Sequence, residues 1–127
     1  MKTNNIIGRY SLLKHGVYNI NNEYMPSSEY LKGEINYSAD GAISILILFK
    51  ESVEEERDIL SYVGTFEIKS ADLLVHNITL CSRQKRNNGS EERNYKLERN
   101  QLTLGCPLPD GSRFEAVWIK MTKDSKH

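Results

Sequence analysis

The chain is 127 residues long, and its 17 basic side chains balance its 17 acidic ones. This length predicts a single domain over residues 1–127, with a core from 6 to 121 and a disordered tail over 122–127. A net charge of zero argues against a general nucleic-acid or membrane-surface binder, because both functions need a basic excess. No apolar run approaches 18 residues and no signal peptide is evident, so we expect a cytoplasmic protein without a transmembrane span.

The first half of the chain predicts strands separated by turn-forming residues. Gly16 interrupts the first strand, and an Asn-rich loop over 18–28 precedes the second. Asp40-Gly41 predicts a hairpin turn, since Asp and Gly both accept a positive φ. The three strands predicted here are residues 6–17, 30–38 and 42–49.

The segment after these strands differs from them. Ser52 and Glu55 have the spacing of a helix capping box, and acidic residues crowd the first turn, where the helix dipole favours them. One short helix is therefore predicted around residues 52–60. Its glutamates at 54–56 are interpreted as a solvated face, because three consecutive side chains on a helix point in different directions and do not converge on one metal.

The second half of the chain returns to short strands. A polar, basic hairpin tip over 83–90 and a turn at 107–111 separate apolar segments. Such regular spacing of short strands is typical of an all-β sandwich or barrel. The five strands predicted here are residues 62–69, 73–82, 92–99, 101–106 and 113–121.

Eight strands joined mostly by short hairpins predict an antiparallel up-and-down barrel. Closure of such a sheet removes its unpaired edges. A barrel of eight strands is just wide enough to be filled by side chains or to hold one small ligand. The fold class expected is therefore all-β, an eight-stranded lipocalin-like barrel with one short helix.

A series of short motifs follows one order along residues 6–121. They are Gly8-Arg9-Tyr10, Gly33-x-Ile35-x-Tyr37, Asp40-Gly41-x-Ile43-Ser44, Tyr62-x-Gly64-Thr65-Phe66, His76, Arg93, Leu102-Thr103-Leu104, Asp110-Gly111 and Ala116-Val117-Trp118. Through the order of these motifs, the chain resembles the bacterial and fungal lipocalin-like domain family. Members of that family are small cytoplasmic barrels, mostly of unassigned function. The resemblance implies a ligand cavity. The chain departs from it at Tyr10, where the family usually has Gly-x-Trp.

Charged residues mark the outward face of each strand, because an unpaired charge inside a barrel is expensive. On this basis Arg9 points outward, and His15, which shares its face, is expected to be exposed. A one-residue bulge reverses the faces downstream of it. The side chains predicted to face inward are Gly8, Tyr10, Leu12, Leu31, Ile35, Tyr37, Phe66, Ile68, Leu102, Leu104, Cys106, Phe114, Ala116 and Trp118.

Two polar residues share inward faces with apolar ones. His76 is interpreted either as a buried neutral imidazole bonded to a neighbour, or as a polar anchor for a ligand or a general base. Arg93 is interpreted either as a guanidinium that reaches solvent at the rim, or as a fork that grips a carboxylate. Their neighbours on these faces are Leu74, Ile78 and Leu80 for His76, and Tyr95 and Leu97 for Arg93.

These residues predict a protein that binds a small hydrophobic or amphipathic molecule in the barrel interior. Aromatic side chains supply stacking surfaces, and the two polar residues contact the polar end of the ligand. No cofactor or metal site is predicted, since Cys81 and Cys106 form no CxxC pair and are interpreted as small buried hydrophobes. The predicted ligand-binding residues are Tyr10, Tyr37, Phe66, His76, Arg93, Tyr95 and Trp118.

Two alternatives stay open at this point. One is a filled barrel that binds a protein partner, or a second copy of itself as a homodimer, through an apolar outer face. The other is a cyclase or isomerase that holds a reactive substrate in shape, although no catalytic motif is evident. The outer-face residues on which the first alternative rests are Leu46, Leu48, Val117, Ile119 and Met121.

Overall fold

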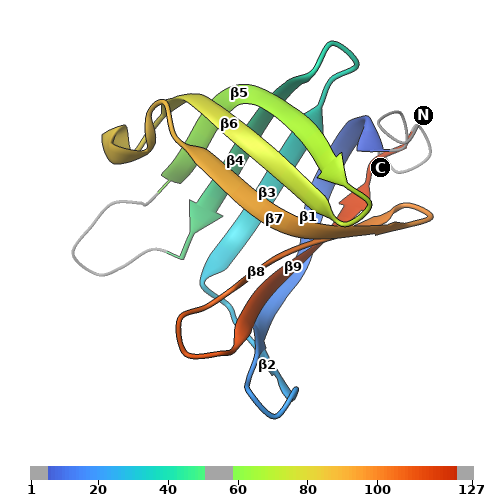
Figure 1. Cartoon of the computed structure of the whole chain (residues 1–127), viewed down its shortest axis with the longest axis vertical. Coiled ribbons are helices and arrows are strands. Elements are labelled where there is room, and N and C mark those ends of the chain that lie inside the picture. The colour runs from blue at the N-terminus through green and yellow to red at the C-terminus, as the bar shows by residue number, and fades with distance from the viewer. Residues whose placement is uncertain (1–5, 51–58, 123–127) are drawn as a thin grey trace.

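Nine antiparallel strands form one sheet that closes on itself in a computed structural model of the chain, which describes residues 6–50 and 59–122 (Figure 1). Neighbouring strands in the sheet follow the chain order from β3 to β9, and β1 pairs with β9 to close it. The strands are β1 (Gly8–Tyr18), β2 (Tyr24–Pro26), β3 (Tyr30–Tyr37), β4 (Ala42–Phe49), β5 (Ile59–Ser70), β6 (Leu73–Cys81), β7 (Ser90–Glu98), β8 (Gln101–Pro107) and β9 (Arg113–Lys120).

Strand β1 holds the barrel together because it pairs with three others. Its beginning pairs with β3, its end pairs with β2, and its other edge pairs with β9 along most of its length. The closed barrel therefore has eight strands, and β2 is an additional short strand. The predicted closed antiparallel barrel is confirmed at this level, and the eight predicted strands all occur.

The short strand β2 lies within the segment predicted to be a loop, and Gly16 does not interrupt β1. A Cβ atom at Gly16 would lie 2.6 Å from the carbonyl oxygen of Met25 and 2.8 Å from the ring of Tyr24. Glycine at this position lets β2 fold back closely against β1. The predicted interruption was therefore wrong, because the glycine marks a close approach of two backbones.

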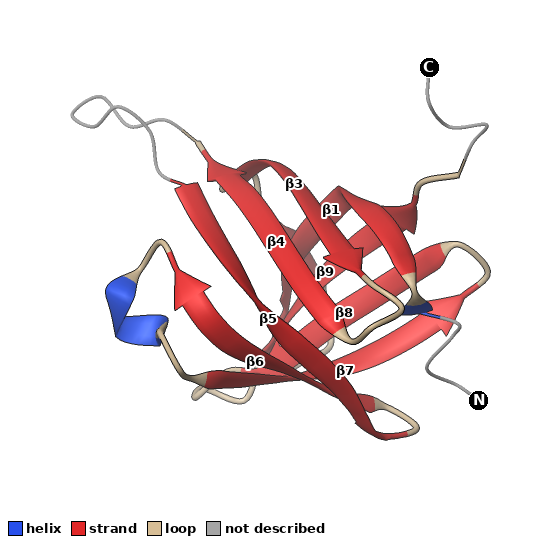
Figure 2. Cartoon of the chain, turned by 90° about the horizontal axis from the view of Figure 1, so that it is seen from above, coloured by secondary structure: helices blue, strands red, loops and turns tan. Residues whose placement is uncertain are grey.

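The predicted helix around 52–60 lies outside the described residues, except that residues 59 and 60 belong to β5. The predicted tail at 122–127 lies outside them apart from its first residue. The basic tip at 83–90 contains a short 3-10 helix, η1 (Gln84–Arg86). This helix lies beside the end of the barrel where β4 ends and β5 begins (Figures 1 and 2).

Side chains that face the barrel interior form the hydrophobic core. The predicted inward positions of Tyr10, Ile35, Tyr37, Phe66 and Trp118 are confirmed, since all five are buried in one cluster. Aromatic side chains of this size bury large areas and dominate the packing of a small domain. The other buried members of the cluster are Ile6, Ile43, Ile45, Ile47, Leu60, Tyr62, Leu74, Ile78, Leu102, Leu104 and Ala116.

A bulge in β1 reverses the predicted orientation of His15. The pairing with β9 shifts between Leu12 and Lys14, and the side chain of Leu13 is exposed. Beyond the bulge the faces alternate in the opposite sense. His15 is consequently buried, with 4% of its surface exposed, and not solvent-facing as predicted. Its ring stacks on Tyr30 at 4.2 Å, and its Nε2 accepts a hydrogen bond of 3.2 Å from the Tyr30 backbone N–H.

Two further irregularities correct the predictions for Leu31 and Leu80, which are both exposed rather than inward. The pairing of β3 with β4 shifts between Tyr30 and Lys32, so Tyr30 turns inward in place of Leu31. The pairing of β5 with β6 shifts by one residue beside Leu80, so that Cys81 packs against the core instead. Single-residue insertions of this kind leave no clear signature in the alternation of apolar and polar residues.

Candidate ligand-binding site

A cavity of about 280 Å³ lies inside the barrel, at the end that η1 borders. Its wall is built from inward-facing positions of five strands, β4 to β6, β8 and β9, together with residues of β3, β7 and the η1 segment. The closed sheet fixes these positions, because the alternation of each strand aims every second side chain at the interior. The apolar part of the wall includes Ile45, Ile47, Phe49, Leu60, Leu104 and Ala116.

A hydrogen-bonded row of three polar side chains crosses the interior. His76 on β6 lies between two tyrosines: its Nε2 is 2.8 Å from the hydroxyl of Tyr37, and its Nδ1 is 2.7 Å from the hydroxyl of Tyr62. His76 and Tyr62 line the cavity, and Tyr37 lies deeper in the core. His76 is 2% exposed, so these two tyrosines supply the partners that a buried imidazole needs.

All three members of this row are uncharged near neutral pH. Burial, with a smaller contribution from the positive charge of Arg93, lowers the pKa of His76 to about 3. Burial likewise raises the pKa of Tyr37 well above 10 and raises the pKa of Tyr62. The interpretation of His76 as a buried neutral imidazole bonded to a neighbour is therefore confirmed.

The direction of the two hydrogen bonds follows from which of the tyrosine hydroxyls can reach an acceptor other than His76. Both hydroxyls have His76 as a hydrogen-bond partner, but Tyr37 lies in the packed core whereas Tyr62 lines the cavity. We infer that Tyr37, which has no other acceptor in reach among the described residues, donates its proton to Nε2. Neutral His76 then carries its proton on Nδ1 and donates it to Tyr62. The hydroxyl proton of Tyr62 is thereby directed to the cavity, where a ligand oxygen would accept it.

Trp118 lines the cavity and carries a buried hydrogen-bond donor. Its side chain is 2% exposed, and its indole Nε1–H has no hydrogen-bond partner among the residues the structure describes. A buried donor without a partner costs about 1–3 kcal/mol.

The cavity mouth carries a carboxylate shared by two arginines. Glu91 Oε1 lies 2.8 Å from Nη2 of Arg93, and Glu91 Oε2 lies 2.8 Å from Nη1 of Arg86. Arg93 is further fixed by a 2.8 Å hydrogen bond from its Nη1 to the carbonyl oxygen of Glu92. Arg83 also lines the mouth, with its guanidinium 5.5 Å from the ring centre of Phe49. Arg93 is half-buried at the rim, in keeping with the first interpretation, whereas its role toward a ligand carboxylate stays a prediction.

The structure brings some of the predicted site residues together and separates others. His76, Arg93 and Trp118 line the cavity. Tyr10 and Tyr37 belong to the packed core, where the Tyr10 hydroxyl donates a 2.9 Å hydrogen bond to the Ile6 carbonyl oxygen. Phe66 packs edge-on against Tyr37, and Tyr95 is half-buried against the core, and neither lines the cavity.

The sequence did not single out three of the polar cavity residues, Tyr62, Glu91 and Arg86, as site residues. Tyr62 lies on the same alternating face as Phe66, so the pattern carried a signal for it. Glu91 shares the face of Arg93, but the strand was predicted to begin at residue 92, whereas β7 begins at Ser90. Arg86 lies in η1, and nothing in its local sequence indicates that its side chain turns toward the barrel.

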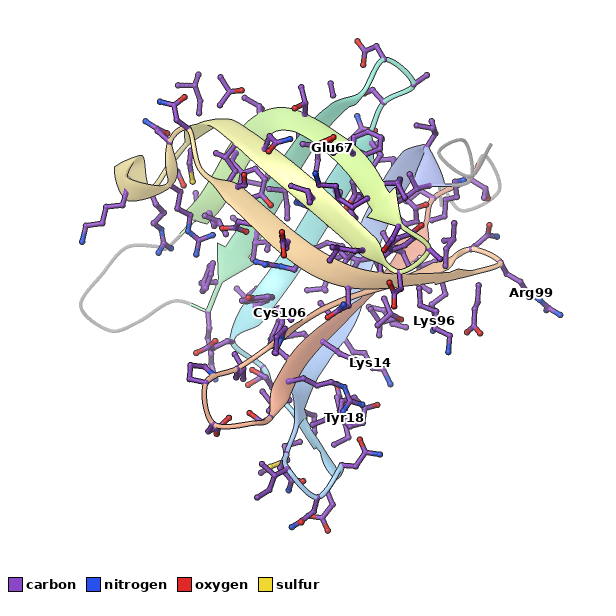
Figure 3. All side chains as sticks on the ribbon, in the orientation of Figure 1. Lys14, Tyr18, Glu67, Lys96, Arg99 and Cys106 are labelled. Atoms are coloured by element: carbon purple, nitrogen blue, oxygen red, sulfur yellow. The ribbon has the colours of Figure 1, made fainter. Side chains whose placement is uncertain are left out.

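A larger hollow of about 530 Å³ lies on the outer face of the barrel, between β1 and β7 to β9. Figure 3 shows Lys14 and Tyr18 on this side of the molecule. Its charged and aromatic groups already pair with one another: the Arg113 guanidinium lies 4.3 Å from the Tyr18 ring centre, and Lys14 lies 5.2 Å from that of Tyr24. We place the candidate site in the interior cavity, because it lies within the barrel and combines an apolar wall with a few polar groups.

The outer apolar residues predicted to form one surface are placed differently from one another. Leu46 on β4 is exposed, whereas Val117 on β9 is buried without belonging to the core cluster. The homodimer contact and the protein-interaction role stay predictions. Within residues 6–50 and 59–122 there is no group of three His, Cys, Asp or Glu side chains that could hold a metal ion. None of the helices in the described part of the chain is long and apolar enough to cross a membrane.

Comparison with known proteins bears on the fold. No family model matches the chain, and no curated protein sequence matches it. A solved structure of a redesigned β-barrel superposes with a TM-score of 0.51 at 12% identity, covering 94% of this chain and 95% of that one. The chain is a β-barrel. At this identity the likeness extends to the fold alone.

Proposed function

We propose that this protein binds a small apolar or amphipathic molecule in the barrel cavity. The observation that carries the proposal is the cavity itself, which combines an apolar wall with a few converging polar groups. This combination is typical of small-molecule sites, whose volumes are roughly 300–1,000 Å³. A cavity of about 280 Å³ lies just below that range, so the ligand is small.

The proposal includes that the barrel is of the lipocalin-like type, because the order of the sequence motifs resembles that of the lipocalin-like domain family. Several motif residues, among them His76 and Trp118, lie in the cavity wall, and Arg93 lies at its mouth. A ligand cavity is what the resemblance implies, and the position of these residues supports it. A cytoplasmic location is part of the same proposal.

Binding is favoured over catalysis by the state of His76. A general base works best when its pKa lies near the operating pH. The pKa of His76 is lowered to about 3 by burial, and the imidazole is bonded on both nitrogens. It therefore orients Tyr62 as a donor and is poorly suited to accept a proton from a substrate.

The chain contains one tryptophan, which makes ligand binding directly measurable. Titration with eight-carbon alcohols and carboxylic acids is expected to change the fluorescence of Trp118, because that side chain lines the cavity. In an Ala116→Leu variant, the larger side chain fills part of the cavity, and affinity is expected to fall by about tenfold or more. Native mass spectrometry of the freshly purified protein would identify a ligand that is retained.

The matched control is Ala71→Leu, which makes the same change at an exposed turn outside the barrel. This variant is expected to bind like the wild type. If the folded Ala116→Leu variant binds as tightly as the wild type, or if no compound of the panel binds the wild type, the cavity is not a binding site.

A further inference from the structure

We propose that the ligand carries a carboxylate, which is held between the guanidinium groups of Arg86 and Arg93 at the cavity mouth. This inference rests on the proposed function and assigns the chemical class of the ligand. It follows from the spacing of the two guanidinium groups, from the ion pairs and exposure of Glu91, and from the hydrogen-bond donor deeper in the cavity wall.

The mouth already holds a carboxylate of the chain itself. The two oxygens of Glu91 bond to different arginines, each at 2.8 Å, so the guanidinium groups are spaced to bridge one planar carboxylate. Hydrogen bonds between a guanidinium and a carboxylate are charge-assisted and roughly twice as strong as neutral ones. A ligand carboxylate of the same shape fits the same pair of donors in competition with Glu91.

The positions of these residues allow the exchange. The side-chain exposure rises from 17% for Glu91 through 29% for Arg93 to 42% for Arg86, so the group reaches from the cavity to solvent. Arg93 keeps its hydrogen bond to the Glu92 carbonyl oxygen when Glu91 leaves, and its guanidinium therefore stays in place. Glu91 can turn to solvent, since its strand β7 is partly exposed at this end.

A hydrogen-bond donor lies deeper in the cavity wall. It is the Tyr62 hydroxyl, which His76 orients from behind. A ligand that offers an acceptor suits this hydroxyl, whereas an ammonium group would meet three guanidinium groups at the mouth against the one carboxylate of Glu91. The apolar body of the ligand would lie against residues such as Ile45, Ile47 and Leu104.

The test uses three compounds with one chain length and different head groups: octanoate, 1-octanol and octylamine. Binding to the wild type is followed by Trp118 fluorescence. Octanoate is expected to bind about tenfold more tightly than 1-octanol, and octylamine more weakly than both, because only the carboxylate forms charge-assisted hydrogen bonds. Added salt is expected to weaken the binding of octanoate and not that of 1-octanol.

Three variants test whether the preference for octanoate depends on the residues at the cavity mouth. Arg86→Gln is expected to reduce octanoate affinity about fivefold and leave 1-octanol within twofold. Glu91→Gln removes the competing charge and is expected to raise octanoate affinity about threefold or more. Lys85→Gln removes the same charge one residue away, on an exposed side chain that does not line the cavity, and is expected to change neither affinity beyond twofold.

The outcomes separate this inference from the proposed function. Equal binding of octanoate and 1-octanol would overturn the carboxylate assignment and leave the cavity as a binding site. Equal losses in Arg86→Gln and Lys85→Gln would also overturn it, because attraction by general positive charge would then explain the preference. Failure of all three compounds to bind would overturn the proposed function together with the inference.

Discussion

Replacing Gly64 by alanine is expected to destabilise the protein by about 3 kcal/mol. Gly64 lies in β5 where the pairing with β6 shifts by one residue. A Cβ atom there would overlap the carbonyl oxygen of Asn77, lying 2.9 Å from its carbonyl carbon and 3.1 Å from the Cα of Ile78. These are backbone atoms of a paired strand, so no side-chain rotation relieves the clash. The expected loss is measurable as a lower midpoint in urea unfolding followed by Trp118 fluorescence.

The matched control is the neighbouring Thr65→Ala variant. Thr65 is exposed on the outer face of the same strand, and its truncation is expected to change the free energy of unfolding by about 0.5 kcal/mol or less. Equal stability of Gly64→Ala and Thr65→Ala would contradict the close approach of the β5 and β6 backbones at Gly64.

Replacing His76 by leucine is expected to cost about 2–5 kcal/mol at pH 7.5, because the hydroxyls of Tyr37 and Tyr62 both lose their partner. The cost is expected to shrink in acid. The pKa of His76 is about 3 in the folded protein and about 6.5 in the unfolded chain, so only the unfolded chain takes up a proton between these values. The stability that neutral His76 provides is complete above pH 6.5 and is lost as the pH falls toward 3.

The difference in stability between wild type and His76→Leu is therefore expected to narrow by about 2 kcal/mol between pH 7.5 and pH 5. Urea unfolding of both proteins across this range measures it. His15 and the carboxylates contribute equally to both proteins, so their titration cancels in the difference. A gap that does not change with pH would show that His76 titrates normally and is not buried as described.

A triple variant separates hydrogen bonding from packing. Tyr37→Phe and Tyr62→Phe, added to His76→Leu, replace the whole polar row by apolar side chains. Replacing both partners of a buried hydrogen bond is nearly neutral, whereas orphaning one is expensive. The triple variant is therefore expected to be more stable than His76→Leu alone. The difference in stability between these two variants is expected not to change with pH, because neither contains His76.

Most of the fold could be predicted from the sequence, because charge and apolar alternation mark the two faces of each strand. The strand order and the inward positions of Tyr10, Ile35 and Trp118 follow from that rule. The rule fails where a strand carries an extra residue, as beside Leu13 and Leu31. A bulge changes which face a side chain occupies without changing the local composition, so alternation alone cannot locate it.

The candidate site was less predictable because it depends on pairing between distant segments. His76 and Arg93 were recognisable as polar residues on apolar faces. Their partners were not: Tyr62 meets His76 through the register of β5 with β6, and Arg86 meets Glu91 across a turn. A residue that is charged and faces inward, such as Glu91, contradicts the rule used to assign faces, and only its two arginines explain it.

The pairing of β1 with β9 has a consequence for the synthesis of the chain. Tyr10 pairs with Lys120 and Tyr18 with Arg113, so about 100 residues are made between the two partners. At about 5–20 residues per second, one edge of β1 waits roughly 5–20 s on the ribosome for its neighbour. The barrel cannot close until its last strand has left the exit tunnel, and until then the edge of β1 is open to pairing with other chains. Closure thus has to follow the synthesis of β9, even though most hairpins of the sheet can form while the chain is growing.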